Sequence, residues 1–264
     1  MNELLLQRHS DILEMMSLWR SITTTNLKKI AAENDSYDAF RKRIAKLEKG
    51  GVLKSILNKG YNKIIYPSDD LLKNFGVYNF NVDNVRHDAA VTGVVYELSK
   101  YEIVKSIELP HQYKTKSTWR HKVIEPDAIL RIEKNGQKNY VALEIELWRK
   151  GNSRVIEKFT DYAKASEYSY VFYIFPNMPS LNSYKLRLNE FLKNPEFTHL
   201  HSALEKKLVL IFNGDISKRL DDLNESFVYY DKKELKLNDL LGEKESSSYA
   251  STCDKFSTIK NETS

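Results

Sequence analysis

Three carboxylates lie on two neighbouring segments that the sequence predicts to be β-strands. Asp127 follows Pro126 and opens the apolar run 128–130, and Glu144 and Glu146 lie inside the apolar run 141–147. Side chains alternate between the two faces of a strand, so Glu144 and Glu146 share one face. Mg²⁺ and Mn²⁺ are hard cations that prefer carboxylate oxygens. The sequence therefore predicts a site for Mg²⁺ or Mn²⁺ with Asp127, Glu144 and Glu146 as metal ligands.

The turn between the two segments is predicted at 134–137, because Lys-Asn-Gly-Gln is typical of a β-hairpin. A hairpin places Asp127 near the acids of the second strand. On that strand the acids share a face with Ala142, and the side expected to face the core carries Val141, Leu143, Ile145 and Leu147. The alternative is that the acids lie on a solvated outer face, where charged residues are usually found.

A helix is predicted over 85–100, because apolar residues recur on one side of it. His87 lies on that side and is a candidate catalytic base, since imidazole transfers protons near neutral pH. The same spacing is typical of a histidine at the edge of a core. Glu97, on another part of this helix, is a candidate accessory acid or a surface charge.

Composition limits the class of protein. The 264 residues leave room for one large or two small domains, and a hydrophobic content of 41% is enough for a packed core. Lys and Arg number 41 against 36 Asp and Glu, which gives a net charge of +5. Cys253 is the only cysteine, which excludes a disulfide framework and a thiolate zinc site. No apolar run reaches the ~18 residues of a membrane span, and no secretory signal is recognisable. We expect a cytoplasmic protein without a membrane partner.

The first 67 residues have the pattern of a winged helix-turn-helix domain. Helices are predicted over 4–19, 23–33 and 36–49, followed by a hairpin of strands 52–57 and 61–66. In that motif the third helix enters the major groove and the hairpin touches phosphates. The predicted DNA contacts of helix and hairpin tip are Tyr37, Arg41, Lys42, Lys46 and Lys59. The alternative is a helical cap whose lysines form a solvated face.

Residues 68–242 are predicted to form one further domain. The order is helix, three strands, helix, strand, helix, strand, which favours a mixed sheet flanked by helices. The basic stretch 114–122 suits a nucleic-acid backbone, with an aromatic ring available to stack on an unpaired base. Its predicted DNA contacts are Lys116, Trp119 and Arg120. From about 243 to 264 the chain has little to bury, and we expect a disordered tail.

These motifs resemble a known superfamily. Pro126-Asp127, Glu144-Ile145-Glu146 and the order of elements resemble the PD-(D/E)XK nucleases. Together with the winged-helix pattern, His87-Asp88 and the segment 158–162, they resemble the plasmid replication-relaxation family and the related MobC-type relaxases. The resemblance implies an α/β protein with an N-terminal winged helix-turn-helix and a restriction-endonuclease-like core. It also implies a plasmid or mobile-element protein that binds DNA at an origin and nicks it.

The chain departs from the superfamily pattern at one position. Glu146 stands where the pattern has a lysine that stabilises developing negative charge. Lys158, on the helix after the strand, is our candidate to replace that lysine, and Lys150 is the second candidate. Tyr162 is a conceivable covalent nucleophile if the protein is a relaxase. The predicted catalytic set is Asp127, Glu144, Glu146, Lys158 and His87.

Two other functions are compatible with the sequence. A nuclease fold that has lost its catalytic set would act as a DNA-binding regulator of transcription or replication. A protein-interaction module would bind no DNA and would show no salt dependence. Double-stranded DNA, single-stranded DNA at a nick and a second copy of the chain are the partners that we predict for the nuclease.

Overall fold

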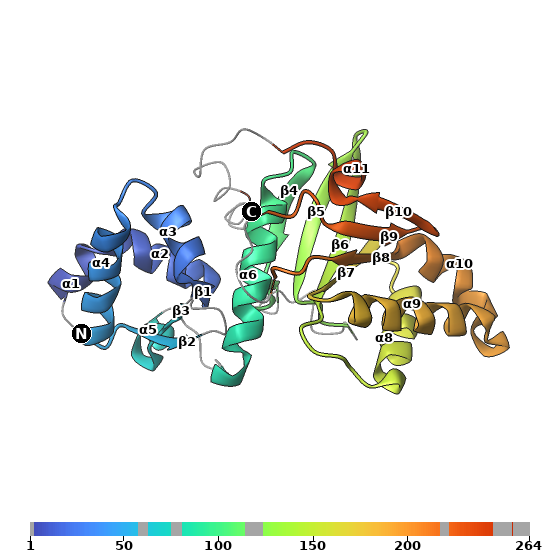
Figure 1. Ribbon diagram of the computed structural model, residues 1–264, viewed down its shortest axis with the longest axis horizontal. Coiled ribbons are helices and arrows are strands. Elements are labelled where there is room, and N and C mark those ends of the chain that lie inside the picture. The colour runs from blue at the N-terminus through green and yellow to red at the C-terminus, as the bar shows by residue number, and fades with distance from the viewer. Residues whose placement is uncertain are drawn as a thin grey trace, which may run out of the picture. The chain divides into compact units, whose positions relative to one another are not determined.

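The computed structural model describes residues 3–57, 63–74, 81–113, 124–216, 222–244 and 255. The chain is a mixed α/β protein, as predicted, and its helices and strands can be followed in Figure 1. It divides into two compact units: unit 1 ends at Val94 and unit 2 begins at Val95. Each unit is described by itself below.

Unit 1 combines short helices with a small antiparallel sheet. Its strands lie in the order β1-β3-β2. The elements in chain order are α1 (Glu3–Gln7), α2 (Ser10–Trp19), β1 (Ile22–Thr23), α3 (Thr24–Ala31), α4 (Tyr37–Lys49), β2 (Leu53–Leu57), β3 (Lys63–Pro67) and α5 (Asp69–Asn74). The strand β1 was not predicted, because two residues are too few to show an alternating pattern.

Local sequence signals fix where two helices of unit 1 begin. Thr23 caps α3 by accepting a hydrogen bond from the Asn26 N–H at 3.2 Å, and Ser36 caps α4 by accepting one from the Ala39 N–H at 3.2 Å. These caps satisfy N–H groups that have no partner in the first turn of a helix. Both helices begin where their hydroxyl residues predicted.

One arginine ties α4 to the elements that precede it. Arg43 Nη2 donates to both carboxylate oxygens of Asp11 at 2.5 Å, and Nη1 donates to Asp35 at 2.8 Å. Its Nε donates to Nδ1 of the buried His9 at 3.3 Å. His9 has a non-helical backbone, so the single helix predicted over 4–19 is wrong. It is two helices, α1 and α2.

Helix α6 (Val85–Ser99), preceded by a 3₁₀ turn (Val82–Asn84), continues from unit 1 into unit 2. Its first half packs on the small sheet, because Val85 and Ala89 form an apolar cluster with Ile64 and Tyr66. Ser21 Oγ also donates to the Val85 carbonyl at 3.0 Å. The division between the compact units falls inside α6, whereas the sequence placed a domain boundary after residue 67.

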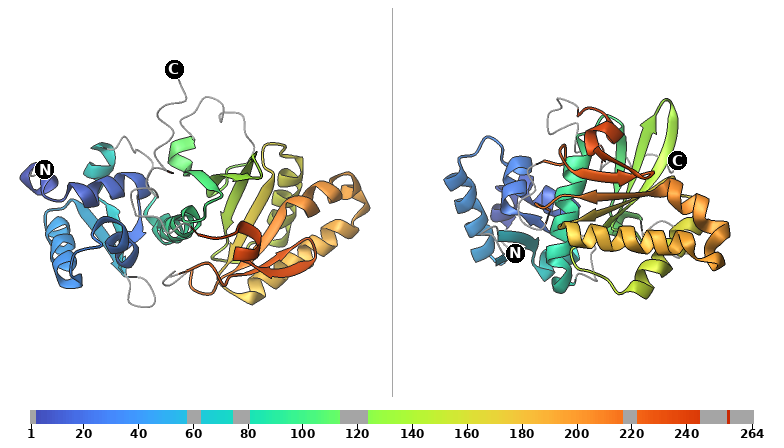
Figure 2. Two further views of the ribbon diagram at one scale, coloured as in Figure 1. Left: turned by 90° about the horizontal axis from the view of Figure 1, so that it is seen from above. Right: turned by 45° about the vertical axis from the view of Figure 1, so that its right-hand side comes forward.

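Unit 2 is built on a mixed sheet of seven strands, flanked by helices as predicted. The strand order is β10-β9-β8-β7-β6-β5-β4; β6, β7 and β8 are parallel to one another and the remaining neighbours are antiparallel. Figure 2 shows this sheet and its helices from two further directions. After α6 the elements are β4 (Val104–Glu108), α7 (Pro110–Tyr113), β5 (Ala128–Lys134), β6 (Gln137–Ile145), α8 (Asn152–Lys164), β7 (Tyr170–Phe175), α9 (Met178–Lys193), a 3₁₀ turn (Pro195–Phe197), α10 (Thr198–Lys207), β8 (Leu208–Phe212), β9 (Phe227–Tyr230), β10 (Lys233–Lys236) and α11 (Leu237–Leu241).

The predicted hairpin between β5 and β6 is confirmed. Lys134 pairs with Gln137, and Asn135 and Gly136 between them have positive φ angles of 53° and 75°. Two consecutive residues with φ > 0 are what a type I′ hairpin turn requires. The hairpin brings the residue before β5 opposite the end of β6.

The main core of unit 2 lies between one face of the sheet and helices α8, α9 and α10. The sheet contributes Ile129, Ala142, Val171, Tyr173, Phe175, Leu208 and Leu210, and the helices contribute aromatic residues such as Phe159 and Phe191. Ala142 shares its face with Glu144, so the acids point toward this helix-covered face. The opposite face, with Leu143 and Ile145, is also buried. The expectation that only the side opposite the acids faces a core is therefore wrong.

None of the helices that the structure describes combines the length and the apolar character needed to cross a lipid bilayer.

Candidate active site of unit 2

Asp127 and Glu144 lie opposite each other where β5 begins and β6 ends. Asp127 directly precedes Ala128, which pairs with Leu143, and the Asp127 N–H donates to the Leu143 carbonyl at 2.8 Å. Asp127 Oδ2 accepts a hydrogen bond from the Ile145 N–H at 2.7 Å. The hairpin register therefore holds the Asp127 side chain beside Glu144, on the same face of the sheet.

Glu144 is almost completely buried, with 1% of its surface exposed. Helix α8 supplies both of its partners: Lys158 Nζ donates to Oε2 at 2.5 Å, and the Tyr162 hydroxyl donates to Oε1 at 2.5 Å. Lys158 and Tyr162 are four residues apart, so they lie on one side of α8. A buried carboxylate needs such donors, because an ionised group without partners is very costly inside a protein.

The electrostatics of this cluster set the protonation of its members. Burial raises the pKa of Glu144, the nearby charge of Asp127 raises it further, and Lys158 and Tyr162 oppose the shift. Burial, together with the charge of Glu144, raises the pKa of Tyr162 well above its usual range. Tyr162 therefore remains protonated and donates its hydrogen to Glu144. This buried, protonated hydroxyl does not suit the role of covalent nucleophile that the sequence allowed.

Glu146 has a separate set of partners. Only 2% of its surface is exposed, and Lys150 Nζ donates to Oε1 at 2.5 Å. Its N–H donates to the Ile174 carbonyl at 2.9 Å, which extends the pairing with β7. Burial, followed by the charge of Glu146, raises the pKa of Tyr184 on α9, and a hydrogen bond with Glu146 adds to this shift. Each glutamate thus has one lysine near the surface and one tyrosine in the core.

The predicted three-carboxylate metal site is not assembled. Within the described parts of the chain, no group of three or more His, Cys, Asp or Glu side chains is arranged to hold a metal ion. The reason is that Glu146 is held by Lys150 and Tyr184, apart from the pair formed by Asp127 and Glu144. These two carboxylates remain a donor set of the kind that Mg²⁺ and Mn²⁺ use, since Mg²⁺ is commonly held by one or two carboxylates together with water.

The other predicted catalytic residues have different positions. Lys158 lies at Glu144, and Lys150, the second candidate, lies at Glu146. His87 lies on α6 in unit 1, where its Nδ1 is 3.7 Å from Asp88 Oδ1. Glu97 is not a surface charge: it is buried and paired with Lys100 at 2.5 Å.

Sequence reasoning missed the tyrosines that complete both glutamate sites. Tyr162 was considered only as a nucleophile, and Tyr184 was not considered at all. Tyr162 carried a usable signal, because it follows Lys158 by one helical turn. Tyr184 carried none, since only the folding of α9 over the sheet brings it to Glu146.

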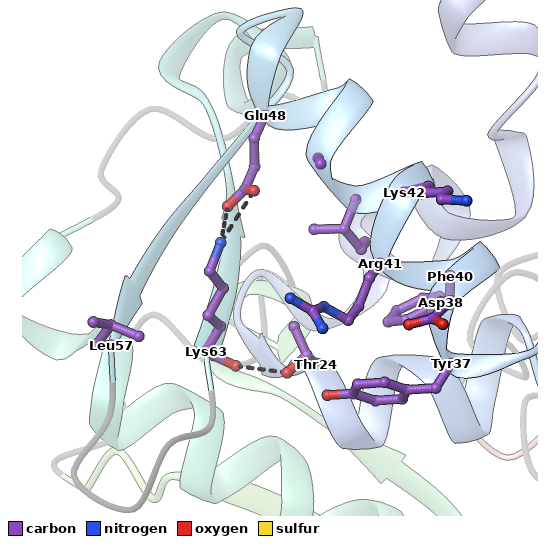
Figure 3. A pocket seen from close by; sticks show the side chains of 11 residues that line it. Thr24, Tyr37, Asp38, Phe40, Arg41, Lys42, Glu48, Leu57 and Lys63 are labelled. Carbon is purple, nitrogen blue, oxygen red and sulfur yellow. Dashed lines mark hydrogen bonds and ion pairs between the residues drawn. The ribbon is translucent and has the colours of Figure 1, made fainter.

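A second candidate site is the outer surface of α4 in unit 1. Tyr37, Arg41, Lys42 and Lys46 are all exposed. Among described residues, none of the three cations forms an ion pair. An open groove of about 650 Å³ lies between α4, the start of α3 and the strands β2 and β3, and it is lined by Tyr37, Arg41 and Lys42 among others. Figure 3 shows Arg41 extending from α4 toward the strand that carries Lys63. The predicted contacts Lys59, Lys116, Trp119 and Arg120 lie outside the described residues.

Comparison of the chain with protein-family models, with curated proteins and with solved structures found no match.

Proposed function

We propose that the chain is a DNA-binding protein whose unit 2 cleaves phosphodiester bonds with a divalent cation held by Asp127 and Glu144. The order α6, β4, β5, β6, α8, β7 supports a PD-(D/E)XK nuclease core. In unit 1, the order helix, strand, helix, helix, hairpin and the strand order β1-β3-β2 support a winged helix-turn-helix. The resemblance extends the proposal to nicking at a plasmid origin.

The observation that carries the proposal is the contact between Lys158 and Glu144 beside Asp127. Lys158 of α8 donates to Glu144, which supports our proposal that it takes the part of the lysine that the superfamily pattern has in place of Glu146. With 22% of its side chain exposed, Lys158 reaches the protein surface, whereas Glu144 is buried. The site therefore combines a partly exposed cation with the half-buried carboxylate of Asp127, a combination suited to a phosphate group and a metal ion.

Each residue has a distinct part in the proposed reaction. Asp127 and Glu144 would hold Mg²⁺ or Mn²⁺, which polarises the scissile phosphate and lowers the pKa of a bound water. Tyr162 keeps the carboxylate of Glu144 in a fixed orientation by donating a hydrogen bond to Oε1. Lys158 stabilises the negative charge that develops on the phosphate oxygens.

Nicking of supercoiled DNA tests the proposal. The DNA carries the protein's own upstream region, and Mg²⁺, Mn²⁺ or EDTA is present. We expect metal-dependent open circles with the wild type and a loss of at least about 100-fold in Asp127→Asn and Glu144→Gln, because each removes a negative ligand from the metal. Glu157→Gln is the matched control, since Glu157 is an exposed acid next to Lys158 on α8. Equal nicking by all four proteins would exclude this site.

The second candidate function is a DNA-binding regulator built on an inactive nuclease fold. The observation that favours it is that Glu144 and Glu146 are each already neutralised by a lysine. A regulator of this kind would bind the same DNA with equal affinity in Mg²⁺ and EDTA and would produce no open circles. Measuring binding and nicking on the same samples separates the two functions.

A further inference from the structure

The segment that joins β6 to α8 carries an exposed aromatic ring among cations. Trp148 has 62% of its surface exposed. Arg149 precedes Lys150 in the loop, and Arg154 lies in the first turn of α8; both arginines are exposed. In the part of the chain that the structure describes, neither arginine forms an ion pair. We call Trp148, Arg149, Lys150 and Arg154 the Trp148 surface.

The Trp148 surface is anchored at Glu146, which follows Glu144 of the candidate active site by two residues. Glu146 is fixed to β7 through its N–H, and Lys150 is fixed to Glu146 through its ammonium group. Trp148 lies between these two anchored residues. Two residues of extended chain span at most about 7 Å, so the Trp148 backbone lies within that distance of Glu146.

The chemistry of this surface selects a type of ligand. An exposed indole on a segment that also carries exposed arginines suits a polyanion with flat, apolar faces, which describes nucleic acid. The bases of a duplex are already stacked on one another, so a protein ring stacks best on an unpaired base. Guanidinium groups bind the phosphates between the bases.

We propose that the Trp148 surface binds single-stranded DNA next to the carboxylates of unit 2, with Trp148 stacked on a base. The inference rests on the proposed function and deepens it: unit 2 would act on a strand that is locally unpaired, as at a melted origin. Trp148 is then a residue that positions the strand and has no part in the bond-breaking step.

Binding of fluorescein-labelled oligo-dT, followed by anisotropy, tests the proposal on the full chain. We expect Trp148→Ala to weaken binding about tenfold and Trp148→Phe to change it by less than about threefold, because phenylalanine still stacks. Arg154→Ala should reduce the slope of log Kd against log salt by about 0.7, the value for one phosphate of a single strand. Tyr140→Ala is the matched control, since Tyr140 is an exposed aromatic residue at the other end of β6.

The possible outcomes separate this inference from the proposed function. Oligo-dT binding that is equal in the wild type and Trp148→Ala, or that does not depend on salt, would overturn the inference even if metal-dependent nicking is observed. Loss of oligo-dT binding in Trp148→Ala would support the inference even if no nicking is found. That second result would support single-stranded DNA binding at the Trp148 surface and would contradict only the proposed cleavage by unit 2.

Discussion

At the scale of single residues, Glu144 shows how the fold holds a carboxylate inside a core. Lys158 neutralises it from the surface side, and Tyr162 donates a hydrogen bond from the core side. Replacing both members of such a pair by apolar residues can leave stability unchanged. Removing only one member leaves the other as a buried charge without a partner, which is strongly destabilising. The stability of unit 2 should therefore depend strongly on Lys158.

We expect Lys158→Met to destabilise unit 2 by about 3 kcal/mol at pH 8 and by much less at pH 5. Lys158 lowers the pKa of Glu144, so its removal raises a pKa that burial already raises. A folded-state pKa above that of the unfolded chain means that stability falls as pH rises between the two values. At acid pH Glu144 is protonated, and the cost of burying its charge disappears. Urea unfolding followed by circular dichroism at both pH values measures the effect.

Lys158→Arg is the control for this prediction, since it keeps a cation and hydrogen-bond donors near Glu144. We expect it to lose less stability at pH 8 than Lys158→Met and to show less dependence on pH. A Met variant that loses equal stability at both pH values would mean that packing of the lysine stem, rather than its charge, stabilises the site.

Strand alternation was sufficient to predict that Glu144 and Glu146 share a face, and the hairpin turn was sufficient to bring Asp127 to them. Their burial was not predictable in this way, because the outward placement of acids is only a general tendency. Helices α8 and α9 decide it, by covering that face and supplying Tyr162 and Tyr184. The separation of Glu146 from Asp127 and Glu144 follows from the same packing and has no signal in the sequence.

At the scale of elements, segments with a clear cap or turn residue were predicted well, and segments without such a residue were missed. Helices α3 and α4 begin at the predicted hydroxyl caps, and the Asn135-Gly136 turn was recognisable. The hairpin of β9 and β10 was missed, because its turn residues Asp231 and Lys232 have positive φ angles without a glycine. Strand β10 also lacks an apolar pattern, since most of its residues are exposed.

Arg43 connects α4 to the preceding elements, because its guanidinium group donates hydrogen bonds to three residues earlier in the chain. Because Asp11 and Asp35 are partly exposed, we expect Arg43→Ala to lower the stability of unit 1 by only about 1–2 kcal/mol. Lys42→Ala changes an exposed neighbour and should stay within about 0.5 kcal/mol of the wild type. Hydrogen exchange of the α2 and α4 amides measures both. Equal protection in the two variants would show that apolar packing alone holds α4.

At the scale of the whole molecule, the two compact units divide inside α6, whereas we predicted a domain boundary after residue 67. The segment Pro67-Ser68-Asp69-Asp70 is typical of a domain boundary. However, Leu71 and Leu72 of α5 are buried, and α6 begins on the small sheet. Local breaker residues mark the end of a strand and not the end of a folded unit. The division between the compact units falls further along, between Val94 and Val95 of α6.

Lys244, at the end of the described range 222–244, is also part of unit 2. Lys244 Nζ donates to Asp222 at 2.5 Å and to the buried Glu97 at 3.3 Å. The hydroxyl of Tyr101 donates to Asn238 at 2.8 Å. Residues 243 and 244 therefore do not belong to the disordered tail that we predicted from 243, and the rest of that tail, apart from Lys255, lies outside the described residues.

The two units make separable contributions to the proposed DNA binding. If α4 contacts duplex phosphates, Arg41→Ala, Lys42→Ala and Lys46→Ala should each reduce the slope of log Kd against log salt by about 0.9. Lys193→Ala, an exposed lysine on α9, is the matched control and should leave the slope unchanged. Asp127→Asn should bind duplex as tightly as the wild type. Anisotropy titrations of a labelled duplex between roughly 50 and 200 mM salt, where such slopes are steep, measure the wild type and the five variants. Slopes that fall in Lys193→Ala but not in the α4 variants would move the duplex site from unit 1 to unit 2.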